Sequence, residues 1–408
     1  MSEGREFQEI AHCGGQVIFT VDRGDDGRRR YRVTWQSSRP VPAAVYSIYA
    51  LREGIPIADL PMGGIGAPWP APPVPGCVPV FVASDSEGKF GFQCPRCDQY
   101  WRTRGGVSLC PYCGAHAERH EFLSAAQRVY VRLYCEKLDE ALSADEDGTH
   151  VIDMDAVADA AGQDVAKPPF YCAEESQQKQ FDCTACGEFN DVLGRFAYCS
   201  VCGTRNDLSE LEGSIIPAIR DDLNRGVVPS SCLKDIGSAF DTFVGQYTGQ
   251  LIRNRPMRSA RRERIGKMRF HDLVATRREL FGGFDIDICE GLTEAEIATA
   301  TRSFQRRHVY EHNGGEVDEK YLRDSGDTLV RLKQSIRETQ AGVHEFANLV
   351  LRMARNLHRG FHDIYEPAKG AIGRYEAEKK RLAALQRQNE GRSRAPPVNT
   401  AKPQLRGE

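Results

Sequence analysis

Eight cysteines form two sets with the same spacing. In each set a Cys-x2-Cys pair is followed, after twelve intervening residues, by a second Cys-x2-Cys pair. The first set comprises Cys94, Cys97, Cys110 and Cys113, and the second comprises Cys183, Cys186, Cys199 and Cys202. The N-terminus lacks the basic-then-apolar pattern of a secretory signal, so paired thiols at this spacing indicate metal binding rather than disulfides. Four thiolates complete a tetrahedral shell, which predicts two structural Zn²⁺ ions.

The two cysteine sets belong to a longer repeat. A shift of 89 residues superposes all four cysteines and places Phe92 on Phe181. A helical run follows each copy, beginning near Glu121 and near Glu210. We interpret this as a duplication of a strand, a cysteine module and a helix. Both modules resemble zinc ribbons, in which bound metal can supply about 10–16 kcal/mol toward folding a unit too small to bury its own core.

The first cysteine module also carries aromatic and basic residues, in the stretch RCDQYWRTRGG. Tyr100 and Trp101 lie among arginines, a composition suited to base stacking and phosphate contact, so both are candidate RNA-binding residues. The alternative is that the two rings cover the metal knuckle. The second module lacks this cluster.

A second chemical grouping lies at RRHVYEHNGG, residues 306–315. A helix that opens with the capping box Thr293 and Glu296 is expected to end here, at Asn-Gly-Gly. A guanidinium offers parallel donors to a phosphate, and a histidine can take or give a proton near neutral pH. The spacing therefore brings phosphate-binding and acid–base groups to one helix end.

Arg307, four intervening residues and His312, between two helices of a bundle, resemble the signature of the HEPN superfamily. That resemblance implies a dimeric helical bundle that cleaves RNA without metal, leaving a 2′,3′-cyclic phosphate, in toxin or anti-phage defence. It makes Arg307, His312 and Asn313 the candidate catalytic residues and Arg306 and His308 candidate RNA contacts. Two alternatives remain: a non-catalytic zinc-ribbon scaffold whose bundle only dimerises or binds RNA or nucleotide, and a purely structural helix end. A protein partner is a further expectation.

The sequence predicts a multidomain α+β protein. The expected parts are a small β unit (1–55), a Pro/Gly linker (56–78), ribbon 1 with its helix (79–145), an acidic linker (146–166), ribbon 2 with its helix (167–226), an all-helical HEPN-like bundle (228–365) and a basic, mostly disordered tail (366–408). The β unit should contain a hairpin across Gly24–Gly27, which the run AAVYSIYAL could join. An apolar stripe from Leu329 through Leu357 to Phe361 predicts one long packed helix.

Composition excludes a membrane protein: 40% of the residues are hydrophobic and 27% are charged, and no apolar run approaches the length of a bilayer span. We expect a cytoplasmic protein. The net charge of -3 conceals a basic segment, residues 253–278, and an acidic one, residues 139–185. The basic segment could contact phosphate, or it could pair with the acidic one.

Overall fold

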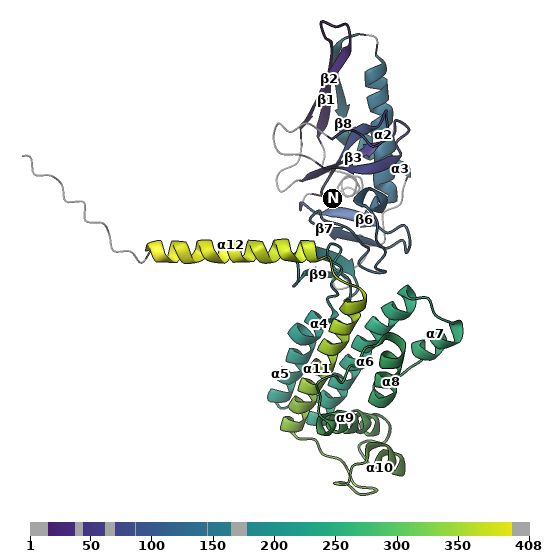
Figure 1. Cartoon of the computed structure of the whole chain (residues 1–408), viewed down its shortest axis with the longest axis vertical. Helices are drawn as coiled ribbons and strands as arrows, with labels where there is room; N and C mark the ends of the chain where they lie inside the picture. Colours follow the sequence, from purple (N-terminus) through teal and green to yellow (C-terminus); the bar gives the residue numbers. More distant parts are fainter. Residues whose placement is uncertain are drawn as a thin grey trace, which may run out of the picture.

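The computed structural model describes residues 15–36, 44–61, 70–85, 87–144, 146–164 and 178–393. In Figure 1 the N-terminal strands lie at the top with helices α2 (Ala125–Ser143) and α3 (Met154–Asp164), and the helices of the C-terminal half lie at the bottom. The predicted α+β class, with its all-helical C-terminal region, is confirmed.

The first sheet has the order β2-β1-β8 and is antiparallel. Strands β1 (Gln16–Arg23) and β2 (Arg29–Gln36) form the predicted hairpin across Gly24–Gly27. Strand β8 (Gly148–Asp153) pairs with the other edge of β1, and α3 follows it directly. The acidic-linker prediction for 146–166 is therefore wrong over these two elements, because Ile152 and Met154 find buried positions in a core built by distant residues.

The second sheet, β4-β3-β5, corrects two expectations. Strand β3 (Val45–Ala50) comes from the third apolar run, but it pairs with β4 (Pro56–Leu60) and β5 (Val78–Ala83) rather than joining the hairpin. Strand β4 lies within the predicted linker 56–78. Pro56 obscured it in the sequence, yet a proline is tolerated at the first position of an edge strand. Residues 62–69 of that linker lie outside the described residues.

The third sheet joins the two cysteine modules. Its order is β6-β7-β10-β9, with β6 (Phe90–Gln93) and β7 (Tyr100–Thr103) from ribbon 1 and β9 (Gln178–Asp182) and β10 (Phe189–Leu193) from ribbon 2. Each ribbon is followed by helix, as predicted: α2 after the first, and α4 (Asp207–Glu210), the π-helical turn η4 (Leu211–Ile215) and α5 (Ile216–Asn224) after the second. A 3₁₀ turn, η1 (Arg119–Phe122), precedes α2.

An approximate two-fold axis relates the ribbons within this sheet. The 89-residue shift places Tyr100–Thr103 of β7 on residues 189–192 of β10, and the strands pair so that Arg102 lies opposite Asp191, its own equivalent. Two backbone hydrogen bonds obey the same symmetry. Leu109 donates to the Ser200 carbonyl (3.2 Å), and Tyr198, the equivalent of Leu109, donates to the Pro111 carbonyl (2.8 Å). The duplicated units thus pack as a dimer does, but inside one chain.

The helical half is built on α6 (Pro229–Asn254) and α11 (Gln340–Ile364), which pack against each other along their length. Around them lie α7 (Ser259–Gly266), α8 (Leu273–Phe284), α9 (Glu294–His312) and α10 (Glu319–Ser325). The capping box of Thr293 and Glu296 is present at the start of α9. At its end, Gly314 and Gly315 take positive φ values, which glycine adopts without steric cost.

The predicted long stripe spans two different structures. Helix α11 begins at Gln340, and its buried face includes Val343, Leu357 and Phe361. Leu329, by contrast, lies in the preceding loop and is 79% exposed. The apolar spacing is continuous in the sequence, but the residues before Gln340 form a loop and not a further turn of α11. The leucines of this loop therefore gain no core contacts.

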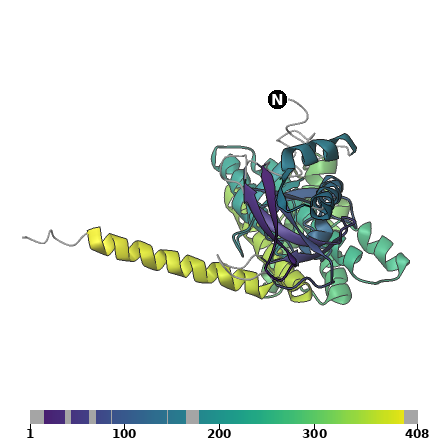
Figure 2. The same ribbon diagram turned by 90° about the horizontal axis from the view of Figure 1, so that it is seen from above.

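Helix α12 (Lys369–Ser393) occupies much of the segment expected to be a mostly disordered tail, starting where the sequence allowed a helix. It projects sideways from the body in Figure 1 and again in Figure 2. Its N-terminal end is attached to ribbon 2, where Ala368 donates its backbone N–H to the Cys202 carbonyl (2.8 Å) and Ala371 and Ile372 pack against the cysteines. Abundant Ala, Leu, Lys, Glu and Arg favour helix even without a tertiary partner. Residues 394–408 lie outside the described residues.

Candidate functional site

Both cysteine sets form compact four-thiol clusters. In ribbon 1 the Sγ atoms of Cys94 and Cys113, and those of Cys97 and Cys110, are 3.7 Å apart. In ribbon 2 the corresponding distances are 3.6 Å for Cys183–Cys202 and 3.5 Å for Cys186–Cys199. Zinc–sulfur bonds of about 2.3 Å in a tetrahedron place sulfurs about 3.8 Å apart, so both clusters have the geometry to hold a metal ion.

Local backbone geometry builds each cluster. Backbone N–H groups of the knuckles point at the sulfurs, as from Arg96 to Cys94 Sγ and from Tyr112 to Cys110 Sγ, both 3.4 Å. The hydrogen bond from Cys110 lowers the pKa of Cys113 to about 5 despite burial. The ionised thiolate is the form of cysteine that binds metal.

The aromatic residues of ribbon 1 lie in its core. Tyr100 is 3% exposed and Trp101 is fully buried, where its ring contacts Phe92 and Phe122 at centroid distances of 5.9 and 5.2 Å. Neither ring offers a face to a base, so the RNA-stacking interpretation is wrong for both. The alternative, that these side chains pack beneath the metal knuckle, is what the structure shows.

Opposite charges meet on the axis between the ribbons. Arg102 donates from Nη2 (2.7 Å) and Nε (3.0 Å) to Oδ2 of Asp191 and from Nη1 to Asp85 (2.9 Å). The Asp191 side chain is fully buried, and that of Arg102 is 14% exposed. This ion pair joins β7 and β10 at the centre of the shared sheet. A symmetric dimer would place two identical residues at this position.

Ribbon 2 is joined to the helical half through Arg205. Its guanidinium pairs with the buried Asp207 (2.9 Å) and lies over the rings of Tyr198 and Tyr247, 4.7 and 5.4 Å from their centroids. Its backbone N–H donates to His362 Nε2 on α11 at 3.2 Å. This buried network fixes the position of the metal knuckle against α6 and α11.

Two histidines complete this junction. The Tyr247 hydroxyl lies 2.7 Å from Nδ1 of His358, and the His358 and His362 rings are 4.5 Å apart. Burial, with smaller contributions from His362 and Arg205, lowers the pKa of His358 to about 3. Both imidazoles are consequently neutral at pH 7, as a buried site beside a cation requires.

The end of α9 presents a pair of histidines. His308 and His312, one turn apart, have ring centroids separated by 4.4 Å, and His312 is exposed. Burial first, and then the positive charges of Lys320 and His312, lower the pKa of His308. Asn313 ends the helix and donates from Nδ2 to Asp318, the N-cap of α10. Asn313 therefore links two helices at the edge of the histidine pair.

The two arginines of the motif are engaged within the bundle. Arg306 pairs with Asp327 (2.8 Å) and Glu338 (3.3 Å) and donates to the Tyr321 hydroxyl. These contacts hold the loop before α11. Because its guanidinium is occupied in this way, the expectation that Arg306 contacts RNA is corrected. Arg307 is 11% exposed and pairs with Glu311 (3.1 Å).

Helix α6 leaves room for Arg307. A side chain at Gly237 would place its Cβ 2.5 Å from Arg307 Cδ, and Nη2 of Arg307 donates to Ser238 at 3.3 Å. Five residues of α-helix turn through about 500°, so His312 points about 140° away from Arg307. Within one chain the structure does not bring these two candidate catalytic side chains together.

A cavity of about 420 Å³ adjoins the histidine pair. It is lined by residues from the α7–α8 connection, from α8, from α9 and from α10: Met268, Arg269, His271, Asp272, Ala275, Gln305, His308, Lys320 and Asp324. The sequence analysis missed His271, although it lies inside the basic segment, directly before the N-cap of α8. No spacing rule connects residues 271, 308 and 320.

The basic segment pairs locally. Arg264 binds Glu279, Lys267 binds Glu263 and Arg277 binds Asp287. Among the residues that the structure describes, no ion pair joins this segment to residues 139–185; residues 145 and 165–177 of the acidic segment lie outside them. Arg258, Arg262 and Arg269 are exposed and form no ion pair in the described part of the chain.

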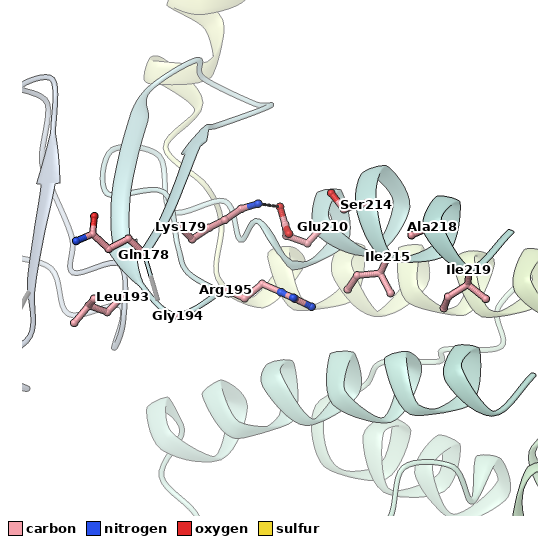
Figure 3. Close-up of a pocket in the computed structure, with 10 residues that line it drawn as sticks. All are labelled: Gln178, Lys179, Leu193, Gly194, Arg195, Glu210, Ser214, Ile215, Ala218 and Ile219. Atoms are coloured by element: carbon pink, nitrogen blue, oxygen red, sulfur yellow. Dashed lines mark ion pairs between the residues drawn. The ribbon is translucent and has the colours of Figure 1, made fainter. Parts of the chain in front are cut away.

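A larger cavity, of about 1010 Å³, lies between the β9–β10 hairpin and helices α4 and α5 (Figure 3). Lys179 and Glu210 form an ion pair across it (2.7 Å), and Ile215 and Ile219 supply apolar walls. It is lined by neither histidine nor cysteine. The Glu210 carboxylate in its lining is thus already paired with Lys179.

Comparison with known proteins finds no matching family model, no similar curated protein and no similar solved structure. The HEPN resemblance thus rests on Arg307, His312 and their helical setting. None of the described helices combines the length with the apolar composition needed to cross a bilayer.

Proposed function

We propose that the helical half binds RNA at the end of α9 and cleaves it without a catalytic metal. The observation that supports this most strongly is the His308–His312 pair beside a cavity that also holds Lys320 and Arg269. Unpaired arginines of the basic segment extend the positive surface and would attract a phosphate backbone.

The chemistry asks for one base and one acid. A base removes the ribose 2′-hydroxyl proton, the 2′ oxygen bonds to the adjacent phosphorus, and the phosphorus–O5′ bond breaks as an acid protonates the leaving oxygen. The products are a 2′,3′-cyclic phosphate and a 5′-hydroxyl. His308, whose lowered pKa keeps it neutral at pH 7, is suited to the base role. His312, exposed at the helix end, is suited to the acid role.

Arg307 can contribute only after a rearrangement. Its guanidinium would have to leave Glu311 to bind a phosphate, and in a HEPN-type dimer it would then face His312 of a second copy. The occupied state of Arg307 favours the second candidate function, in which the bundle dimerises or binds RNA but does not cut it.

The ribbons serve this function as structural modules in our proposal, each holding one zinc ion in a closed four-thiolate shell. Zinc there fixes the knuckle and supplies no step of the reaction. Ligand thiolates require a reducing compartment, which agrees with a cytoplasmic location.

Cleavage of a labelled RNA during brief exposure to EDTA tests the proposal. We expect cutting to persist, to leave cyclic phosphate ends and to spare DNA, which lacks the 2′-hydroxyl. His312→Ala should slow cleavage by about 100- to 10,000-fold. His344→Ala is the control, since His344 contacts Asn224 and does not line the cavity. RNA that binds but stays intact under all conditions would select the non-cleaving alternative.

A further inference from the structure

The cavity beside α9 contains a second histidine that no motif identified. We infer that His271, oriented by Asp241, and His308 form an acid–base pair for RNA cleavage within a single protomer, with Lys320 binding the phosphate between them. This inference rests on the proposed function. It differs in that one protomer supplies all the reacting groups of the site, so that no second copy has to contribute a residue.

Asp241, on α6, holds His271 from behind. The His271 backbone N–H donates to Asp241 Oδ1 at 3.1 Å, and the imidazole Nδ1 lies 3.6 Å from the same oxygen. This Nδ1 is buried and has no hydrogen-bond partner. Because Nδ1 faces the carboxylate, Nε2, on the opposite side of the ring, is the nitrogen available to a ligand in the cavity. A carboxylate behind a histidine selects its tautomer and stabilises its protonated form.

The carboxylates that line the cavity already have partners. Asp272 caps α8 by accepting from the Ala275 backbone N–H (3.0 Å), and Asp324 accepts from Arg323 (3.0 Å). Among the described residues, Lys320 and Arg269 form no ion pair. The cavity therefore offers two unpaired cations and two imidazoles to an anion, a composition suited to a phosphodiester. Its volume of about 420 Å³ is within the range of small-ligand sites, so it can take one nucleotide unit.

The two histidines suit complementary roles. His308 accepts the 2′-hydroxyl proton, and the imidazolium form of His271, backed by Asp241, gives a proton to the departing O5′. The 2′ oxygen–phosphorus bond forms as the phosphorus–O5′ bond breaks, so atoms and charge balance without any further reactant. Lys320 stabilises the added negative charge on the phosphoryl oxygens. In this assignment His271 takes the acid role for which His312 was the first candidate, and His312 contacts His308 from outside the cavity.

Charged groups surround this pair on every side. From α6 comes Asp241, from α9 come Arg307 and His312, from α10 come Lys320 and Asp324, and from the α7–α8 connection come Arg269 and Asp272. The single His271 variant proposed below, His271→Gln, leaves all of these groups in place. A change in the pH profile can then be assigned to the lost imidazole.

The test compares full-length wild type with His271→Gln, Lys320→Ala and Asp241→Asn in two assays. The first measures kcat and its pH profile on a cleavable RNA. The second measures affinity for the same oligonucleotide made with 2′-O-methyl groups, which cannot be cut. His344→Gln and Lys379→Ala are matched controls outside the cavity, and a thermal melt of each variant verifies the fold.

We expect His271→Gln to lower kcat about 100- to 10,000-fold and to remove one limb of the bell-shaped pH profile, while binding the uncleavable RNA within about twofold of wild type. Lys320→Ala should weaken that binding and lower the slope of log affinity against log salt by about 1. Asp241, a positioning residue, should shift the pH profile when changed to Asn and leave binding unaltered.

Two outcomes separate this inference from the proposed function. If wild type cuts RNA and His271→Gln cuts it equally well, the His271 assignment is wrong and the proposed function stands. If wild type cuts no RNA, the proposed function fails together with the acid–base roles. In that case the affinity for the uncleavable RNA tests the cavity. If neither His271→Gln nor Lys320→Ala changes this affinity, the cavity is not a phosphate site.

Discussion

The two ribbons have the same cysteine spacing and share one sheet, yet they belong to different parts of the molecule. Cys94, Cys110 and Cys113 of ribbon 1 lie inside the large core of the N-terminal half, which also contains Trp101. The cysteines of ribbon 2 form a small cluster of their own, covered by the start of α12 and attached to the bundle through Arg205. A repeated metal knuckle has become a core element in one copy and a joint between domains in the other.

The axis between the ribbons shows how the duplicated copies became distinct. A symmetric dimer would pair a residue with itself at this point, so any charge there would face a like charge. Arg102 and Asp191 occupy the two equivalent positions and form a buried ion pair instead. Opposite charges make the pairing of unlike copies favourable and the pairing of like copies unfavourable, which specifies the intramolecular arrangement.

Loss of metal should have the largest effect and should separate the two ribbons. Cys110→Ser and Cys199→Ser are each expected to reduce bound metal from two ions to one, since closed four-thiolate sites contribute about 10–16 kcal/mol. Cys199→Ser should also accelerate hydrogen exchange in α6 and α11, because ribbon 2 contacts both; Cys110→Ser should act mainly on the N-terminal half. Elemental analysis and hydrogen-exchange mass spectrometry check these expectations. Unchanged exchange in α6 after loss of the metal of ribbon 2 would show that ribbon 2 does not stabilise the helical half.

The equivalent positions 116 and 205 offer a matched pair of substitutions. His116 is exposed in ribbon 1, whereas Arg205 is 2% exposed in ribbon 2, and both occupy the same short bridge of their knuckles. Arg205→Met leaves Asp207 buried without its cation and should cost about 3–5 kcal/mol of unfolding free energy. His116→Met should stay within about 0.5 kcal/mol. Urea denaturation measures both, and equal costs would show that the two knuckles have the same role.

The charge pair on the axis should have a smaller effect. Asp191→Asn removes a charge-assisted acceptor from Arg102, which keeps Asp85, so we expect a loss of about 1.5–3 kcal/mol. Asp182→Asn is the control, because its pair with Arg104 spans the same sheet but is exposed on both sides. That substitution should cost no more than about 1 kcal/mol. A double-mutant cycle with Arg102→Met measures the coupling free energy between Arg102 and Asp191. A coupling free energy near zero would show that this ion pair does not stabilise the shared sheet.

Acid should loosen the joint more gradually. The folded pKa of His358 lies near 3, below the ordinary value, so between these pH values the unfolded chain binds a proton that the folded chain does not. Stability is therefore complete above about pH 6.5 and falls as the pH drops toward 3, by about 1.4 kcal/mol per unit for each such histidine. His358→Gln should flatten this slope in urea titrations between pH 7 and pH 5. A slope identical to that of wild type would exclude His358 as its source.

The sequence by itself determined the features set by local spacing. Cysteine intervals fixed two four-thiol clusters, Thr293 and Glu296 fixed the start of α9, and Gly24–Gly27 fixed the first hairpin. Each depends on residues close in the chain, whose covalent geometry limits the available conformations. For the candidate site, local spacing along the chain identified the end of α9 with His308 and His312. It did not identify the residues from other elements that lie beside them.

Only the tertiary structure decided what those groups face. Strand β8 pairs with β1 across more than a hundred residues, Trp101 is buried by Phe122, and Arg306 and Arg307 are held by carboxylates. His271 reaches His308 because α8 and α9 pack side by side, which no interval between 271 and 308 encodes. Burial and charge pairing depend on distant partners, and a side chain's chemistry follows from them: the sequence supplies an imidazole or a guanidinium, and packing decides whether it is free to act.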